Sequence, residues 1–278
     1  MNRDISSVVS AKRIIDDGDM RLYRALPSPG RTAVGPFVFF DHYRHQSLRG
    51  IGDKPHPHAG IELISYVLEG GMEHRDSMGF RDRLGPGDAQ WIRAGRGILH
   101  AEQPLGGRHG LQVWASLPPG QKFAEPAYKS WRAAAIPQVD LPGTRIRVVA
   151  GSVAGVDGPV RLTTPATFAH VRIDPGATIN VAVDADAELG VYVLDGGLGA
   201  GSVGPVCEGS LALLTPGDAV VLTGATNQST DLVIIGGAPA VGPILFSGPF
   251  VMGTEAEMAE AKRAYAAGDM GRLEGVPF

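Results

Sequence analysis

Two short histidine-containing segments hold the residues of this chain that are best suited to chemistry. His56-Pro57-His58 is followed, forty-two residues after its second histidine, by His100-Ala101-Glu102. Residues two apart on an extended strand point to the same side, so each segment can present both of its side chains to one interior point. Two such strands would supply three imidazoles and one carboxylate, a ligand set for a divalent transition metal with open coordination positions. The alternative interpretation of a His-x-His pair is a surface or loop pair.

The residues around the second segment favour the metal interpretation. Gly95-Arg96-Gly97 precedes it and Pro104 follows it, and such tight backbone punctuation is expected where a strand must be directed at a fixed point. We therefore predict a metal site that contains the four residues His56, His58, His100 and Glu102. Iron, manganese, cobalt, nickel, copper and zinc all accept this ligand set, so the residues alone leave the metal open.

Length and composition indicate a turn-rich globular protein. The 278 residues suffice for two hydrophobic cores. Glycine occurs 39 times and proline 21 times, yet 44% of the residues are hydrophobic, which is typical of many short strands joined by tight turns. The net charge is −4 and no basic run occurs, so we expect no direct binding to nucleic acid.

The cysteine content and the apolar runs indicate the compartment. Cys207 is the only cysteine, which excludes an intrachain disulfide and a thiolate metal site and favours a reducing environment. The first residues lack the apolar stretch of a secretory signal, and no uncharged apolar run reaches the roughly eighteen residues that span a bilayer. We expect a cytoplasmic protein without membrane contact.

Apolar runs between glycine and proline turns predict strands in the first half of the chain. The predicted strands lie at 37–40, 61–68, 72–76, 89–92 and 110–117. Glu69-Gly70-Gly71 predicts a hairpin turn, and the polar segment 41–57 is expected to be a loop that leads to the first histidines. This succession of strands is typical of a β-barrel or β-sandwich.

The second half repeats this pattern. Its predicted strands lie at 167–173, 189–194, 210–214, 219–222 and 231–235. The sequence at 191–197 echoes that at 65–71, and 215–218 echoes 85–88. We therefore predict an all-β protein of two related barrels packed together, with domains at 1–137 and 138–278.

The second copy lacks the candidate ligands. The stretch that aligns with the first histidines, near 180–184, holds no histidine, and Asn227 and Gln228 are weak substitutes for the second segment. His170 stands alone in a predicted strand, so we expect a structural or surface role. We expect no metal in the second barrel.

Near the end of the chain, Thr254-Glu255-Ala256-Glu257 has the form of a capping box. It precedes Met258 to Ala267, which is rich in helix-forming residues and is followed by Gly268. The pattern predicts a short C-terminal helix that packs on the outside of a barrel.

Several longer motifs resemble the pirin family of the cupin superfamily. They are His-Pro-His-Ala-Gly-Ile-Glu at 56–62, Tyr-Val-Leu-Glu-Gly-Gly at 66–71, Pro-Gly-Asp-Ala-Gln-Trp at 86–91, Ala-Gly-Arg-Gly-Ile-Leu-His-Ala-Glu at 94–102, His-Gly-Leu-Gln-Val-Trp at 109–114 and Gly-Pro-Phe-Val-Met at 248–252. The resemblance implies two cupin barrels with one metal, usually iron, in the N-terminal barrel. It implies that the ligands are His56, His58, His100 and Glu102, which leaves Glu62, the acid of the broader cupin motif, as a supporting residue.

The resemblance also implies an activity. Similar proteins are quercetin 2,3-dioxygenases, which open the central ring of a flavonol with O2 and release carbon monoxide. In such a reaction Glu102 would be the catalytic residue that accepts the proton of the substrate hydroxyl. Pirins are also implicated as iron-dependent redox sensors that bind regulatory proteins, so a non-enzymatic protein-binding regulator is the main alternative. A different cupin enzyme, such as an isomerase, is a third.

Four aromatic residues and three polar ones accompany the site. Phe39, Phe40, Trp91 and Trp114 could line an aryl pocket, although core packing is the simpler role for each. Asp41, His42 and His45 are expected in the loop before His56, either at the pocket mouth or exposed, and Gln112 is expected near the metal or in solvent.

Overall fold

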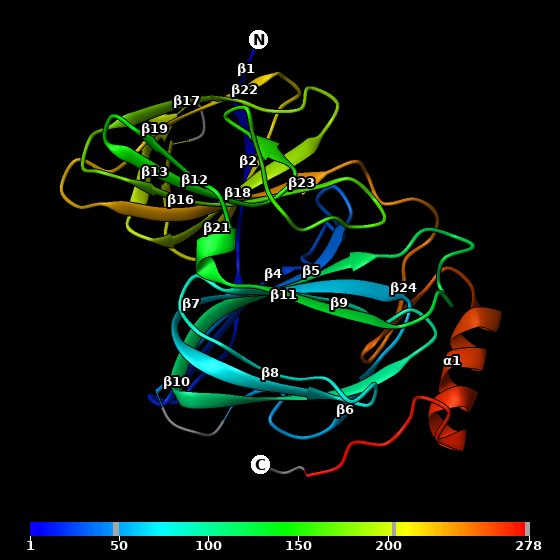
Figure 1. Cartoon of the computed structure of the whole chain (residues 1–278). Helices are drawn as coiled ribbons and strands as arrows, with labels where there is room; N and C mark the ends of the chain where they lie inside the picture. The colour runs from blue at the N-terminus through cyan, green and yellow to red at the C-terminus, as the bar shows by residue number, and fades with distance from the viewer. Residues whose placement is uncertain (47–49, 202–203, 276–278) are drawn as a thin grey trace. The chain divides into compact units, whose positions relative to one another are not determined.

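The computed structural model describes residues 1–46, 50–201 and 204–275. Figure 1 shows a chain built mainly of strands, with helix α1 (Glu255–Ala267) near its C-terminus. The all-β fold with a short C-terminal helix is confirmed. The chain divides into two compact units: unit 1 combines 1–12, 23–37 and 134–239, and unit 2 combines 13–22, 38–133 and 240–278.

Unit 1 contains a seven-stranded sheet, a three-stranded sheet and two two-stranded sheets. Its strands are β1 (Asn2–Arg3), β2 (Ile5–Ser10), β12 (Gln138–Leu141), β13 (Thr144–Ala150), β14 (Ser152–Val153), β15 (Val156–Asp157), β16 (Ala166–Ile173), β17 (Thr178–Ala182), β18 (Glu188–Asp195), β19 (Gly197–Gly201), β20 (Gly204–Cys207), β21 (Ser210–Leu214), β22 (Ala219–Thr223) and β23 (Thr230–Gly237). The seven-stranded sheet has the order β12-β13-β16-β23-β18-β21-β2, the three-stranded sheet has the order β1-β22-β17, and the two-stranded sheets are β14-β15 and β19-β20. A short 3-10 turn, Ala133–Ala135, begins at the last residue of the unit 2 segment 38–133 and continues into the third segment of unit 1.

The core of unit 1 is formed by the apolar residues of strands in which apolar and polar residues alternate. In β17 the side chains of Ile179 and Val181 are buried while their neighbours are exposed, as expected for a strand with one face on the core. They join Val191, Val220 and Ile234 in one apolar cluster that draws on the seven-stranded and the three-stranded sheet. The centre of this barrel is therefore filled by aliphatic side chains.

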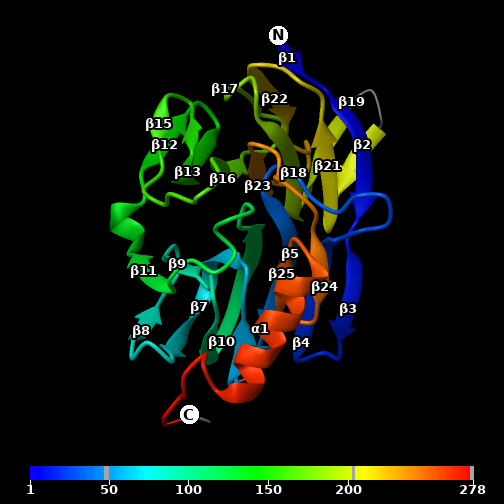
Figure 2. The ribbon, with the colours of Figure 1, turned by 90° about the vertical axis from the view of Figure 1, so that its right-hand side faces the viewer.

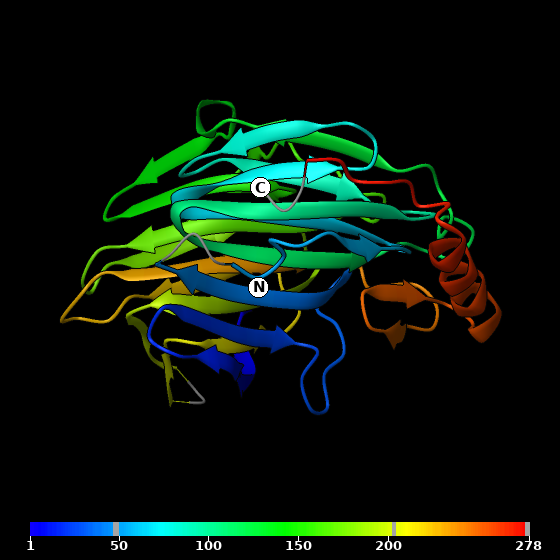
Figure 3. The same cartoon turned by 90° about the horizontal axis from the view of Figure 1, so that it is seen from below.

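Unit 2 carries the candidate ligands. Its strands are β3 (Lys12–Asp16), β5 (Phe37–His45), β6 (His56–His58), β7 (Ile61–Asp76), β8 (Arg81–Leu84), β9 (Ala89–Arg93), β10 (Ile98–Ser116), β11 (Ala127–Trp131), β24 (Leu245–Ser247) and β25 (Phe250–Met252), while β4 (Met20–Leu26) passes from unit 2 into unit 1. The main sheet contains the order β11-β9-β7-β10-β5, and β6 pairs with β10. Figure 3 shows these blue-to-green strands running side by side.

Two long strands differ from the predicted pattern. β7 continues through 69–71, where a hairpin turn was predicted, and so that prediction is wrong. Gly70, with φ of 72°, lets the strand kink without turning back, and a Cβ built on it would lie 2.2 Å from the Gly107 carbonyl oxygen. The pairing register of β7 with β10 shifts between Pro104 and Arg108 at the same level. A bulge with close backbone contact therefore replaces the turn.

The predicted loop at 41–57 is also shorter than expected. β5 continues to His45, and the polar residues Asp41, His42 and His45 are buried inside it. His42 Nε2 lies 2.8 Å from His109 Nε2, so this polar side chain has a partner within the unit. Polarity indicated exposure here, whereas the three side chains are buried, and the placement of these three residues in a loop is wrong.

The last segment of the chain belongs to unit 2. Ala59 forms a bridge with Phe250, and α1 packs through Met258 and Ala261 on the residues around β25, as Figure 2 shows for the helix beside β24 and β25. Thr254 and Glu257 form the predicted capping box, and Gly268 ends the helix in the left-handed conformation, so the helix prediction is confirmed.

The compact units differ from the continuous ranges 1–137 and 138–278 at both ends of the chain. β1 pairs in parallel with β22, and β2 pairs with β21, so the N-terminal strands complete the sheets of unit 1. The C-terminal segment completes unit 2. The N-terminal strands therefore belong to the unit built mainly from 134–239, and the C-terminal segment belongs to the unit built mainly from 38–133.

Candidate metal centre

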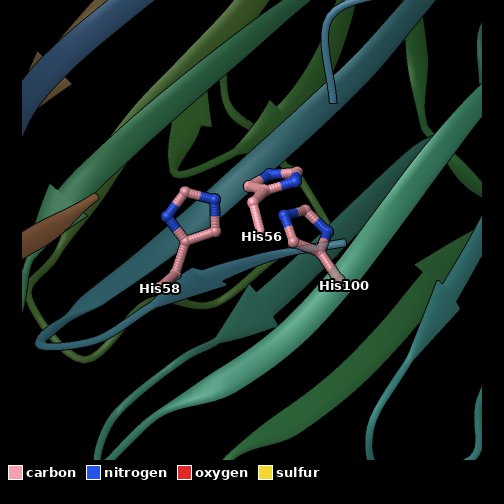
Figure 4. A group of neighbouring side chains, drawn as sticks. All are labelled: His56, His58 and His100. Atoms are coloured by element: carbon pink, nitrogen blue, oxygen red, sulfur yellow. The ribbon is translucent and has the colours of Figure 1, made fainter. Parts of the chain in front are cut away.

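The pairing of β6 with β10 brings three histidines together. His56 lies directly opposite His100, and His58 lies opposite Ile98. One ligand nitrogen from each of His56, His58 and His100 can be chosen so that all three lie within 4.8 Å of one another. Figure 4 shows their rings gathered around one small space, two from β6 and one from β10. The spacing expected from the sequence thus places three imidazoles at one point.

The hydrogen bonds of these histidines leave nitrogens available for a cation. His56 Nδ1 is 2.9 Å from the Lys54 carbonyl oxygen, and His58 Nδ1 is 3.3 Å from the Pro249 carbonyl oxygen. A ring N–H donated to a carbonyl leaves the lone pair of Nε2 available, as in metal-bound histidines. His58 Nε2 and both nitrogens of His100 are buried and have no hydrogen-bond partner among the described residues. Such unpartnered nitrogens fit a divalent transition metal.

Burial keeps the imidazoles of His58 and His100 neutral. Loss of solvation, together with the proximity of His56, lowers the pKa of His58 to about 3. Burial and the neighbouring histidines also hold the pKa of His100 well below its ordinary value. Neutral imidazole is the form that coordinates a metal.

Glu102 lies beside this cluster and has its own partners. Its Oε2 accepts a hydrogen bond from Arg108 Nη1 at 3.0 Å, and its Oε1 accepts one from Gln90 Nε2 at 2.5 Å. Its Oε1 is 3.7 Å from His100 Nδ1. One ligand atom each of His74, His100 and Glu102 lies within 4.8 Å of the other two. The other such group consists of His56, His58 and His100 and does not include Glu102. The structure therefore brings three of the four predicted residues to one point and places the fourth next to His100.

His74 is a neighbour that sequence reasoning missed. It lies in β7 opposite Glu102, its Nε2 is 3.1 Å from Asp76 Oδ2, and its ring stacks on Tyr128 with centroids 4.5 Å apart. Gln90 and Arg108 were missed as well. His74 lies in β7, Gln90 in β9 and Arg108 beyond the bulge in β10. Their proximity to Glu102 therefore depends on a pairing register that residue spacing does not reveal.

Aromatic residues pack against one side of the cluster. Trp114 meets His58 edge to face, with centroids 4.8 Å apart, and stacks on Phe39 with centroids 3.8 Å apart. Gln112 Oε1 accepts a hydrogen bond from Trp114 Nε1 at 3.3 Å. Trp91 Nε1 donates to Glu62 Oε1 at 3.2 Å, so Glu62 is occupied by an indole. Phe40 is fully buried in the core. Phe39 and Trp114 thus support His58.

Two β-sheet units, one with an aliphatic centre and one with a histidine cluster, define a two-domain protein of the cupin type. The residues 19–115 match the family model described as Pirin, and 168–271 match the model described as Pirin C-terminal cupin domain. Pirin of Homo sapiens is 34% identical over 250 residues, covering 87% of this chain and 84% of that protein. The chain belongs to the pirin family.

Solved structures agree with this assignment. The crystal structure of quercetin 2,3-dioxygenase from Acinetobacter baumannii is 26% identical, with a TM-score of 0.87 and coverage of 98% of this chain and 99% of that one. The bacterial pirin YhhW from Escherichia coli, solved in complex with nickel(II), is 18% identical with a TM-score of 0.65, covering 84% of this chain and 100% of that one, and supports the fold alone. Within the described residues no helix has the length and apolarity needed to cross a membrane.

Proposed function

We propose that this protein is a metal-dependent dioxygenase of the pirin type that opens the central ring of flavonols such as quercetin with O2. The observation that carries the proposal is the convergence of His56, His58 and His100, one ring nitrogen of each lying within 4.8 Å of the others, beside a buried carboxylate. The likeness to the quercetin 2,3-dioxygenase of Acinetobacter baumannii over nearly the whole chain supports the same reaction class.

The three imidazoles would hold one divalent transition metal, for which iron is our choice, and Glu102 stands next to His100 as the fourth donor. When bound, such a cation supplies Lewis-acid stabilisation of an oxyanion and holds the reactants in one place. His58 and His100 are fixed for this purpose by burial on strands, and the ring of Trp114, which stacks on Phe39, limits the rotation of His58.

Glu102 is the residue that we propose to accept the proton of the flavonol hydroxyl. Arg108 compensates its negative charge, and Gln90 orients the other oxygen. With Ser65 Oγ at 3.5 Å from Oε1, the carboxylate has three donors, and it still has a lone pair for a proton because an ionised carboxylate offers about four acceptor positions. A positioned base of this kind accelerates proton transfer by about 10²–10⁴-fold.

A substrate would approach from the side of His56. This ring is partly exposed, whereas His58 and His100 are buried. Gly52 lies above it with φ of 83°, and a Cβ at this position would be 3.2 Å from His56 Cε1. Because Gly52 has no side chain, there is room beside His56, the one ring of the three that is partly exposed.

The test is oxygen uptake by iron-loaded protein across a panel of flavonols, with carbon monoxide measured as the second product. We expect both with at least one flavonol, and we expect His100→Ala to remove them. His170→Ala is the matched control, because His170 pairs with Asp231 in unit 1. Absence of oxygen uptake by fully iron-loaded wild-type protein with every flavonol would contradict an enzyme of this class and favour the redox-dependent protein-binding role.

A further inference from the structure

Lys122 is a lysine whose side chain lies inside unit 2, shortly after the end of β10. Pro118 and Gly120 turn the chain there: the Gln121 N–H donates to the Pro118 carbonyl oxygen at 3.0 Å, and φ of Gly120 is 80°. The lysine that follows this turn is only 1% exposed. A buried ammonium is costly unless its protons are hydrogen-bonded, so its partners must be held in place.

The three protons of the Lys122 ammonium have three acceptors, and these come from three different segments. Nζ donates to the Gly60 carbonyl oxygen at 3.0 Å, to Ser116 Oγ at 2.8 Å and to the Val251 carbonyl oxygen at 3.0 Å. Gly60 follows β6, Ser116 ends β10, and Val251 lies in β25. One side chain therefore ties β25 to the two strands that carry the histidines.

The backbone of β25 lies in close contact with the turn between β6 and β7. The Val251 N–H donates to the Ala59 carbonyl oxygen at 3.1 Å, and Ala59 forms a parallel bridge with Phe250. Gly60 has φ of 75°, and a Cβ built on it would overlap the Val251 carbonyl oxygen. The oxygen that accepts from Lys122 thus occupies the space that a side chain at position 60 would need.

The residue before β25, Pro249, provides the hydrogen-bond partner of His58. Its carbonyl oxygen lies 3.3 Å from His58 Nδ1. In a neutral imidazole one nitrogen carries the proton and the other has a lone pair. A proton on Nδ1 that is donated to this carbonyl leaves the lone pair of Nε2 for a cation. His58 Nε2 is buried and has no hydrogen-bond partner among the described residues, as this tautomer requires.

His58 is the histidine whose carbonyl partner is remote in sequence. His56 Nδ1 contacts the carbonyl oxygen of Lys54, two residues earlier in the same segment. The carbonyl that contacts His58 belongs to a residue 191 positions later. Neither nitrogen of His100 has a hydrogen-bond partner in the part of the chain that the structure describes. The tautomer of His58 therefore depends on where β25 lies, whereas that of His56 does not.

We propose that Lys122 is a positioning residue for the candidate metal ligand His58. Lys122 fixes β25 against Gly60, and β25 places the Pro249 carbonyl where it holds the proton of His58 on Nδ1. The lone pair of Nε2 then points to the cation of the proposed metal site, on which this inference rests. Without Lys122, β25 moves away from β6, and the imidazole of His58 also adopts the tautomer with its proton on Nε2, which cannot bind the cation through that nitrogen.

The first measurement is the tautomer of His58, by nitrogen-15 NMR of histidine-labelled, metal-free, full-length protein at neutral pH. Protonated and unprotonated ring nitrogens resonate far apart, and His56→Ala and His58→Ala assign the signals. In wild type we expect the proton of both rings on Nδ1. In Lys122→Met, which removes the three N–H donors and keeps much of the length, we expect His58 to shift toward the tautomer with its proton on Nε2, while His56 stays unchanged.

The second measurement is the dissociation constant of Co(II), by competition titration. We expect it to rise about 10–100-fold in Lys122→Met, as when other groups behind a metal ligand are removed. Loss of a positive charge alone would lower the constant, because less positive charge would then repel the cation. Thr254→Ala is the matched control, since it removes the N-cap of α1 but keeps the contact of Lys122 with β25. It should leave the tautomer unchanged and the constant within about twofold, because its effect is confined to the helix end.

The outcomes separate this inference from the metal site itself. If folded Lys122→Met keeps the wild-type tautomer of His58 and the wild-type Co(II) constant, the role of Lys122 is wrong. Equal changes in Thr254→Ala would also overturn it, because they would come from a general loosening of the C-terminal segment. If the tautomers behave as expected but wild-type protein binds no Co(II), the proposed metal site fails while the positioning of His58 stands.

Lys122→Gln keeps the test decisive if the methionine variant does not fold, as judged by thermal unfolding. Its amide offers two N–H donors for the three acceptors, so part of the hydrogen bonding is retained. We expect smaller changes of the tautomer and of the Co(II) constant in the same direction. A folded glutamine variant identical to wild type in both would contradict the proposal, as would a wild-type His58 that carries its proton on Nε2.

Discussion

The histidines and the carboxylate of this site differ in how they are held. His56 and His58 each contact a backbone carbonyl through Nδ1, so their hydrogen bonds come from the main chain. Glu102 depends on the side chains of Arg108 and Gln90. Replacing a surrounding side chain should therefore alter Glu102 directly and these two imidazoles only through the main chain.

Glu102 and Glu62 provide a matched pair for testing the proton acceptor. Both are 2% exposed glutamates of unit 2, but Glu62 accepts from Trp91, whereas Glu102 lies beside His100. We expect Glu102→Gln to lower the rate of oxygen uptake at saturating flavonol by about 10²–10⁴-fold, since the base is lost. Glu62→Gln should stay within about tenfold of wild type. Equal losses in the two folded variants would assign the effect to burial of a carboxylate and not to proton transfer.

Spacing predicts part of this site and misses the rest for a physical reason. The period of two along a strand places His56 with His58 and His100 with Glu102 on common faces, and this holds in the structure. It carries no information about which residues of another strand lie opposite. His74 and Gln90 meet Glu102 only through the pairing of β7 with β10 and the sheet position of β9.

At the scale of elements, the long strands β7 and β10 build the site by bending. A glycine pair preceded by an acid predicted a turn, because the same residues serve tight turns and bulges alike. The choice between them depends on the neighbouring backbone, here Gly107, which approaches Gly70 too closely for any side chain. Local sequence therefore located the break in the strand but not its geometry.

Gly70 and Gly79 test this close contact. Both have positive φ, but a Cβ at Gly79 would meet nothing within 4 Å, whereas one at Gly70 would lie 2.2 Å from the Gly107 carbonyl oxygen. We expect Gly79→Ala to cost about 1–2 kcal/mol of unfolding free energy, from backbone conformation alone. Gly70→Ala should cost about 2–5 kcal/mol, because displacement of Gly107 adds to that cost. Urea unfolding measures both, and similar losses in the two variants would contradict a tight bulge.

At the scale of the whole molecule, the two units share an architecture and differ in what fills their centres. Unit 1 has an aliphatic cluster, whereas unit 2 buries histidines and charged residues that need partners. Composition, turn residues and the capping box predicted the repeat, the strands of the second half and the C-terminal helix. They did not predict that the N-terminal strands join unit 1, because β1 pairs with β22 and β2 with β21 across 200 residues or more.

We propose that His56, His58 and His100 together hold one metal ion in unit 2. The most direct measurement is elemental analysis of iron-reconstituted and dialysed protein, comparing wild type with His58→Ala, His100→Ala and the unit 1 control His170→Ala, each shown to be folded by circular dichroism. We expect about one metal ion per chain in wild type and in the control, and near zero in the other two, because a centre that loses one of three imidazoles no longer retains its ion through dialysis. Wild-type metal content in folded His58→Ala and His100→Ala would contradict the account.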